Sequence, residues 1–158
     1  FSRPTVLQDG FVERFLEIVR SHDLPSEAIE VEITEGAFMV DEAVVINAMD
    51  TLRAEGFRIA MDDFGTGFSS LNLLRRLPIQ VLKLDKEFLR EGYETDRTQS
   101  ILSDIVGMAQ HLGIRTVCEG VETPEHLELL RRIGCATAQG FYYSRPVDLE
   151  SFKRTYLG

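Results

Sequence analysis

Two adjacent aspartates, Asp62 and Asp63, follow a short apolar run and precede two closely spaced glycines, Gly65 and Gly67. This order indicates a buried strand whose end carries negative charge into a flexible loop. Neighbouring carboxylates repel each other, so both remain ionised only where a cation or hydrogen-bond donors compensate. A divalent cation is the natural compensating group. A solvated Asp-Asp turn is the alternative, because Asp and Gly are common turn residues, and this stretch alone does not separate the two.

The elements around this pair alternate between strand and helix. Alternation of apolar and polar residues predicts strands at 29–35, from 58 into the aspartate pair, at 80–85, at 114–119 and at 138–142. Apolar residues at helical spacing predict helices at 11–19, 44–54, from 69 or 70 to 77, from about 98 to 112, from 123 to Gly134 and at 149–156. Short connections between successive strands and helices are typical of parallel βαβ units.

A polar residue stands near the carboxyl end of each predicted strand. In chain order these residues are Glu32, Asp62, Lys83, Glu119 and Gln139. In a (β/α)₈ barrel the active site lies at this end and is assembled from several strands. A complete barrel needs about 250 residues and eight strands, whereas this sequence predicts five strands in 158 residues. We therefore expect an α/β fold of the (β/α)₈ TIM type, present as an incomplete barrel of five parallel strands with flanking helices.

Two other interpretations of this pattern compete with a common site: a different sheet architecture, and a separate structural role for each polar residue. An open doubly wound sheet suits the length better, although its ligand crevice gathers groups from five strands less easily. Each polar residue also has a structural explanation. Glu32 can belong to a solvated strand face, Lys83 can extend to water, Glu119 can be a loop charge and Gln139 can form hydrogen bonds at a strand end. These explanations must hold separately on every strand, so we favour a common site.

Carboxylates gathered around a pocket are suitable oxygen ligands for Mg²⁺ or Mn²⁺. Two ions bridged by a shared aspartate fit metal-assisted hydrolysis of a phosphate ester, and Lys83 would place a positive charge beside the phosphate. Strand alternation puts Asp62 on the face of Ala60, so Asp63 reaches the same site only if the backbone turns there. Histidine is not needed as a base, and we interpret all three histidines as structural or surface residues: His22, His111 and His126.

Composition limits the classes of partner. With 44% hydrophobic and 27% charged residues, the chain resembles one ordinary globular domain. It contains no apolar run of about 20 residues and no secretory signal pattern, so we expect a cytoplasmic location, or the cytoplasmic part of a membrane-anchored parent, without membrane contact by this segment. A net charge of −9 argues against polymeric nucleic acid as a partner but allows a small phosphorylated ligand beside bound metal. Cys118 and Cys135 form no metal-binding or disulfide pattern, and we expect buried free thiols.

Five motifs occur in a fixed order along the chain. They are Glu-Ile-Thr-Glu at 32–35, Asp-Asp-Phe-Gly-Thr-Gly-Phe-Ser-Ser-Leu at 62–71, Leu-Lys-Leu-Asp at 82–85, Glu-Gly-Val-Glu-Thr at 119–123 and Gln-Gly-Phe at 139–141. In these motifs the sequence resembles the EAL domain, a (β/α)₈-barrel phosphodiesterase that hydrolyses cyclic di-GMP to linear pGpG. The resemblance implies that residues 1–158 are the C-terminal part of a single EAL domain, barrel strands four to eight.

The resemblance also implies roles for the residues of the predicted site. Glu32 and Asp62 would be ligands of Mg²⁺ or Mn²⁺, and Asp63 would serve a second ion. Lys83 would lie beside the attacking water and the phosphate. Glu119 would be a metal-adjacent residue and the candidate general base.

Further roles concern the surroundings of that site. Glu122 and Gln139 would complete the polar wall around the ligand. Glu35 would hold the loop after the aspartate pair in its working position, and Gly65 and Gly67 would give that loop its flexibility.

The chain departs from the family pattern in two metal ligands. The glutamate of the Glu-Ala-Leu signature and an asparagine expected immediately before Phe1 are both absent from this sequence. We therefore expect the isolated chain to be inactive. By resemblance the parent would be a homodimer fused to GGDEF or sensory domains. A non-catalytic cyclic di-GMP receptor is the main alternative, and a different metal-dependent barrel, such as an enolase-type enzyme, is a second one.

Overall fold

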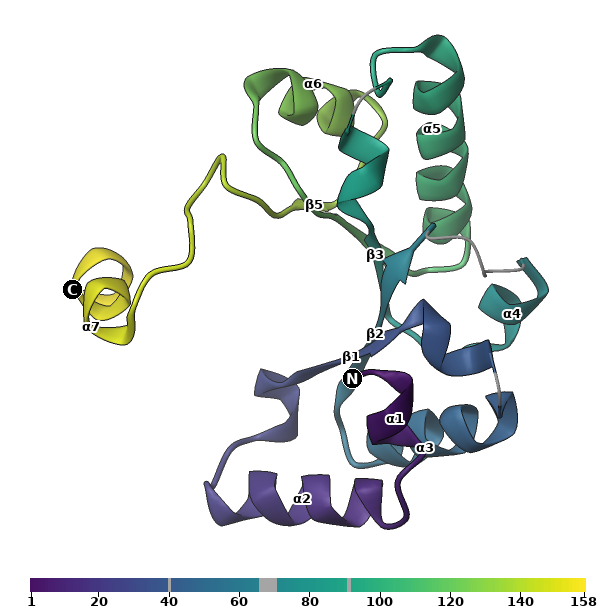
Figure 1. Ribbon diagram of the computed structural model, residues 1–158, viewed down its shortest axis with the longest axis vertical. Coiled ribbons are helices and arrows are strands. Elements are labelled where there is room, and N and C mark those ends of the chain that lie inside the picture. Colours follow the sequence, from purple (N-terminus) through teal and green to yellow (C-terminus); the bar gives the residue numbers. More distant parts are fainter. Residues whose placement is uncertain (40, 66–70, 91) are drawn as a thin grey trace.

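The computed structural model describes residues 1–158 except 40, 66–70 and 91 (Figure 1). Its centre is a five-stranded sheet in the order β1-β2-β3-β4-β5, and every neighbouring pair is parallel. The strands are β1 (Glu30–Thr34), β2 (Arg58–Phe64), β3 (Val81–Leu84), β4 (Arg115–Cys118) and β5 (Thr137–Ala138). Parallel strands in sequential order, each joined to the next by a helical crossover, confirm the predicted incomplete barrel.

Seven helices accompany the sheet in the described part of the chain. They are α1 (Arg3–Val6), α2 (Phe11–Ser21), α3 (Glu42–Ala54), α4 (Leu71–Arg76), α5 (Asp96–His111), α6 (Pro124–Arg132) and α7 (Leu149–Phe152). Side-chain caps begin four of them, because Asp41, Thr95, Thr123 and Asp148 each accept the backbone N–H three residues later. Short 3₁₀ helices lie at Ser26–Ala28, Glu35–Met39 and Lys86–Leu89, and a π-helical turn, Lys153–Leu157, follows α7.

The two faces of the sheet are buried unequally. The larger apolar core fills the space between the sheet and its helices and includes Ile33, Met61 and Leu82. A much smaller cluster of Ala60, Val81 and Val117 lies on the other face, the inside of the barrel. Each of these three residues stands two positions before a polar residue of the predicted site, so strand alternation directs those polar side chains to the inside as well.

Several element boundaries differ from the sequence prediction. β5 is much shorter than the predicted strand at 138–142, because the Tyr142 N–H donates to Val121 O (2.9 Å) and the Tyr143 N–H closes a turn onto Gly140 O (3.1 Å). The first predicted strand ends at Thr34, and Glu35 begins a 3₁₀ helix. Helix α5 begins at Asp96 rather than near 98, because Thr95 caps it.

The two ends of the chain lie in different surroundings. Phe1 lies beside β1, where its amino group donates to Glu32 O and its carbonyl accepts the Thr34 N–H at 3.1 Å. The segment that carries α7 extends away from the rest of the molecule (Figure 1). The predicted caps of α4, Ser69 and Ser70, lie outside the described residues. No helix in the described part of the chain is long and apolar enough to cross a membrane.

Candidate functional site

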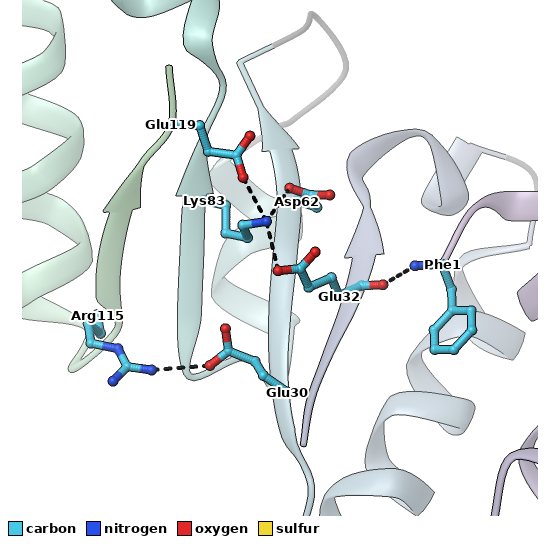
Figure 2. Close-up of polar contacts among 7 residues, drawn as sticks. All are labelled: Phe1, Glu30, Glu32, Asp62, Lys83, Arg115 and Glu119. Carbon is cyan, nitrogen blue, oxygen red and sulfur yellow. Dashed lines mark hydrogen bonds and ion pairs between the residues drawn. The ribbon is translucent and has the colours of Figure 1, made fainter. Parts of the chain in front are cut away.

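Three carboxylates, two on strands and one directly after a strand, surround one lysine (Figure 2). Lys83 Nζ lies 2.7 Å from Glu32 Oε1, 2.7 Å from Glu119 Oε1 and 3.3 Å from Asp62 Oδ1. Lys83 is on β3, Glu32 is on β1, Asp62 is on β2, and Glu119 directly follows β4. The structure thus brings together four of the five predicted strand-end residues. We call Lys83, Glu32, Asp62 and Glu119 the lysine cluster.

The register of the sheet explains why these side chains meet. Glu32 pairs with Ala60, which places Asp62 one inward-facing position further along β2. Lys83 pairs with Val117, and Glu119 is the next inward-facing residue after it. The lysine cluster therefore forms a polar layer directly above the small apolar layer of the barrel interior, at the carboxyl ends of the strands.

Lys83 remains charged in this environment although it is only 5% exposed. Burial on its own lowers the pKa of the ammonium group, but hydrogen bonds to Glu119 and Glu32 and the negative charge of Asp62 outweigh it and raise the pKa above its ordinary value. The ammonium group thus compensates part of the negative charge that the carboxylates bring into the barrel.

Asp63 joins the same region through a turn in the backbone. Its φ of 57° lies in the left-handed region, and the pairing of β2 with β3 shifts between Met61 and Phe64. Burial raises the pKa of the Asp63 carboxyl, and the charges of Asp62, Asp85 and Glu119 raise it further. The backbone turn that the sequence required for Asp63 to approach the site is therefore present.

The donor set suits a hard divalent cation. Buried Asp62 Oδ1 has no hydrogen-bond partner among the described residues and makes only the 3.3 Å ion pair with Lys83. Carboxylate oxygens are the ligands that Mg²⁺ and Mn²⁺ prefer. In the described part of the chain no three acidic, histidine or cysteine side chains are so placed that they could hold a metal ion, because the Lys83 ammonium lies between the carboxylates. A cation would have to take over oxygens that now contact Lys83.

A pocket of about 550 Å³ opens beside the lysine cluster. Glu119 belongs to both, and Glu122 and Gln139 line the pocket wall. Backbone bonds fix the two wall segments to each other, because the Gln139 N–H donates to Cys118 O (2.9 Å) and the Val121 N–H donates to Gln139 O (3.0 Å). The pocket and the lysine cluster therefore adjoin each other and share Glu119.

The sequence did not identify all residues of this pocket. Lys86, Arg90 and Tyr93 also line it, and they belong to none of the five motifs. Phe141 lines it as well, and it ends the Gln-Gly-Phe motif although no role was assigned to it. His126, which the sequence suggested was structural or superficial, is buried but also lines the pocket. The sequence did contain one indication of this role, because His126 stands three residues after the capping residue Thr123. A side chain at that position can accept a backbone N–H that precedes the helix.

Glu35 contacts the loop that follows the aspartate pair. It is 1% exposed, and its Oε2 accepts the Gly65 N–H at 3.1 Å. Gly65 has a φ of +104°, and a Cβ atom there would lie 2.4 Å from the Phe88 ring. Only glycine fits both the backbone conformation and this close approach. Gly67 lies outside the described residues.

The parallel sheet and its helices define a (β/α)-barrel domain. Its charged side chains gather at the carboxyl ends of the strands, where barrel enzymes have their active sites. The profile of the EAL domain matches residues 2–146, and the chain belongs to this family.

Similar proteins include enzymes and solved EAL structures. Cyclic di-GMP phosphodiesterase NbdA of Pseudomonas aeruginosa is 43% identical over 131 residues, which cover 81% of this chain and 17% of NbdA. The EAL domain of Mycobacterium smegmatis DcpA has a TM-score of 0.90 and 34% identity, over 98% of this chain and 69% of that one. A manganese and cyclic di-GMP complex of Klebsiella pneumoniae BlrP1 has a TM-score of 0.81 and 31% identity, over 89% and 36% of the two chains. The chain spans 17–24% of the length of the first three curated relatives.

Proposed function

We propose that this chain is the C-terminal part of an EAL domain, barrel strands four to eight, and that the complete domain hydrolyses cyclic di-GMP to linear pGpG. The observation that carries the proposal is the convergence of Glu32, Asp62 and Glu119 on Lys83 at the carboxyl end of the sheet. A site with several carboxylates and one buried ammonium group suits a phosphate ester held with divalent cations. The names of the relatives and the manganese and cyclic di-GMP complex of BlrP1 support the same reaction.

In this proposal Glu32, Asp62, Asp63 and Glu119 hold the divalent cations, with Mg²⁺ or Mn²⁺ as the expected ions. A bound cation would supply Lewis-acid activation of the water and of the phosphate. Lys83 would then turn its ammonium group from the carboxylates toward a phosphate oxygen, where it stabilises the negative charge that develops.

The hydrolysis has a simple balance of atoms. A water oxygen forms a new bond to phosphorus, and the ester bond between phosphorus and O3′ breaks. One water proton passes to Glu119 as general base, and an equivalent proton returned by the solvent protonates O3′, which leaves as a hydroxyl. Glu122 and Gln139 on the pocket wall would orient the ligand beside this group, and Glu35 would fix the loop that carries Asp63.

The test compares the 158-residue chain with the complete domain of its parent. We expect Mn²⁺-dependent formation of pGpG by the complete domain, measured by liquid chromatography, and none by the chain alone, because two ligands expected from the family pattern are absent from it. Lys83→Met in the complete domain should lower kcat by about 10²–10³-fold. Robust cleavage by the 158-residue chain would disprove the inactivity proposal, and binding of cyclic di-GMP without cleavage by the complete domain would favour a receptor. A homodimeric parent, fusion to GGDEF or sensory domains and a cytoplasmic location remain predictions.

A further inference from the structure

His126 is placed at the start of α6, where the chain leaves the pocket wall. It is 7% exposed, and its Nδ1 accepts the backbone N–H of Glu122 at 3.3 Å. Its own backbone N–H donates to Thr123 Oγ1, also at 3.3 Å. The ring meets Tyr93 edge-on, with 4.6 Å between centroids and an interplanar angle of 84°. His126 is therefore fixed by its backbone N–H, by the contact of its ring with Tyr93 and by its Nδ1.

This arrangement resembles a capping box with one difference. In a capping box the third helical residue, usually Glu or Gln, accepts the N–H of the capping residue. Here the third residue is His126, and its acceptor reaches one residue further back, to Glu122 rather than to the cap Thr123. The bond therefore holds a residue of the pocket wall and not only the end of a helix.

The chemistry of imidazole suits this position. Because Nδ1 accepts an N–H, it carries no proton, and the ring proton is on Nε2. The pocket is lined by three carboxylates and two cations, namely Glu94, Glu119 and Glu122 with Lys86 and Arg90, and a glutamate acceptor would add a fourth carboxylate next to Glu122. A neutral imidazole satisfies the same N–H without added repulsion.

Other contacts hold the rest of the wall segment independently of His126. The Glu119 N–H donates to Leu84 O at 3.0 Å, and Val121 O accepts the Tyr142 N–H at 2.9 Å. Gly140 lies so close that a Cβ atom there would be 2.2 Å from Val121 O. Within the part of the chain that the structure describes, no other hydrogen bond holds the Glu122 backbone, so His126 acts on Glu122 far more than on Glu119.

We propose that His126 is a positioning residue that fixes Glu122 in the wall of the ligand pocket through a neutral Nδ1 acceptor. The effect on ligand binding rests on the function proposed above, whereas the effect on the Glu122 backbone does not. Because Glu119 has its own anchor, loss of the His126 acceptor should weaken ligand binding more than it slows the chemical step.

The test uses His126→Phe, which keeps a ring against Tyr93 but removes the acceptor, and His126→Asn, whose Oδ1 can replace Nδ1. The first readout is amide hydrogen exchange at Glu122 in the 158-residue chain. Loss of one hydrogen bond should speed exchange in His126→Phe by up to about tenfold, and His126→Asn should restore most of the protection. His111→Phe, at an exposed position in the last turn of α5, is the matched control and should leave Glu122 unchanged.

The second readout is steady-state hydrolysis of cyclic di-GMP by the complete domain. His126→Phe should raise KM by about three- to tenfold, the equivalent of one hydrogen bond, while kcat changes by less than about twofold. Unchanged Glu122 exchange in His126→Phe, a failure of His126→Asn to restore protection, or a fall in kcat with unchanged KM would overturn the proposal. If the unmodified domain neither binds nor cleaves cyclic di-GMP, the proposed function fails, and the exchange readout still decides whether His126 positions Glu122.

Discussion

Glu30 and Arg115 form an ion pair although two strands separate them in the sheet. Glu30 Oε2 on β1 lies 3.1 Å from Arg115 Nη2 on β4, with β2 and β3 between their strands (Figure 2). A flat sheet with about 4.8 Å between neighbouring strands would keep β1 and β4 roughly 14 Å apart. The sheet is therefore curved about its inner face. The same curvature brings Glu32, two positions after Glu30, and Glu119, four positions after Arg115, to Lys83.

The two cross-barrel contacts should differ in their contribution to stability. Arg115 and Glu30 have side chains that are 47% and 26% exposed, so Arg115→Met should lower the free energy of unfolding by less than about 1 kcal/mol. Lys83→Met leaves partly buried carboxylates without their counter-ion and should cost about 1–3 kcal/mol. Urea unfolding of both variants at about pH 7 measures the difference. A larger loss for Arg115→Met than for Lys83→Met would contradict this ranking.

The contribution of Lys83 should depend on pH only in strong alkali. The folded chain raises the pKa of Lys83, so the stability gained is fully present below the ordinary lysine pKa of about 10.4 and is lost as pH rises through the higher folded value. The difference in unfolding free energy between the natural chain and Lys83→Met should therefore be constant from about pH 7 to about pH 9. It should shrink only above the ordinary lysine value. A decline already at neutral pH would mean that Lys83 is not held as a cation.

Asp63→Asn should stabilise the cation-free fold at neutral pH. Burial and neighbouring carboxylates raise the pKa of Asp63 in the folded chain. Above the ordinary aspartate pKa the unfolded chain therefore ionises more readily than the folded chain, and this lowers the free energy of unfolding. The gain should vanish in acid, where both states are protonated. Urea midpoints at about pH 7 and about pH 3 test this, with exposed Asp104→Asn as the control. With saturating Mn²⁺ the sign should reverse, because the proposed ligand is then missing.

Gly65→Ala and Gly92→Ala separate a backbone effect from a steric effect. Both glycines have positive φ, +104° and +93°, but an added Cβ meets Phe88 at 2.4 Å only at Gly65 and meets nothing within 4 Å at Gly92. Gly92→Ala should cost about 1–2 kcal/mol from backbone strain, and Gly65→Ala about 2–4 kcal/mol because the ring must also move. Thermal unfolding measures both changes. If Gly65→Ala/Phe88→Leu recovers none of the extra loss, the Phe88 contact is not its cause.

Only one of the two thiols should react in the native chain. Cys118 is fully buried at the end of β4, and burial raises the pKa of its thiol, with smaller contributions from Cys135, Glu119 and Asp85. Cys135 is half-buried, so the expectation that both thiols are buried was wrong for this residue. A disulfide reagent should modify one thiol quickly in native buffer and both in denaturant. Rapid modification of Cys118 in Cys135→Ser would show that β4 opens readily.

The sequence alone determined the order of elements and the face on which each strand residue lies. Side chains alternate strictly along a strand, so Glu32, Asp62 and Lys83 could be assigned to one face from local spacing. Their recurrence at strand ends predicted a barrel site, and the five ordered motifs predicted the EAL family. Boundaries followed less accurately where long-range hydrogen bonds decide them, as in β5, which ends at Ala138 and is followed by a turn that the bond from Tyr142 to Val121 holds.

Only the tertiary structure decided how these residues meet. The curvature of the sheet sets the distance between β1 and β4. Because these strands approach each other, Lys83 contacts both Glu32 and Glu119. The turn at Asp63 and the hydrogen bond from Glu122 to His126 also depend on how the chain packs. A local sequence pattern does not predict such contacts. Local spacing fixes the direction of a side chain relative to its own strand or helix, whereas packing between elements fixes the distances on which the chemistry depends.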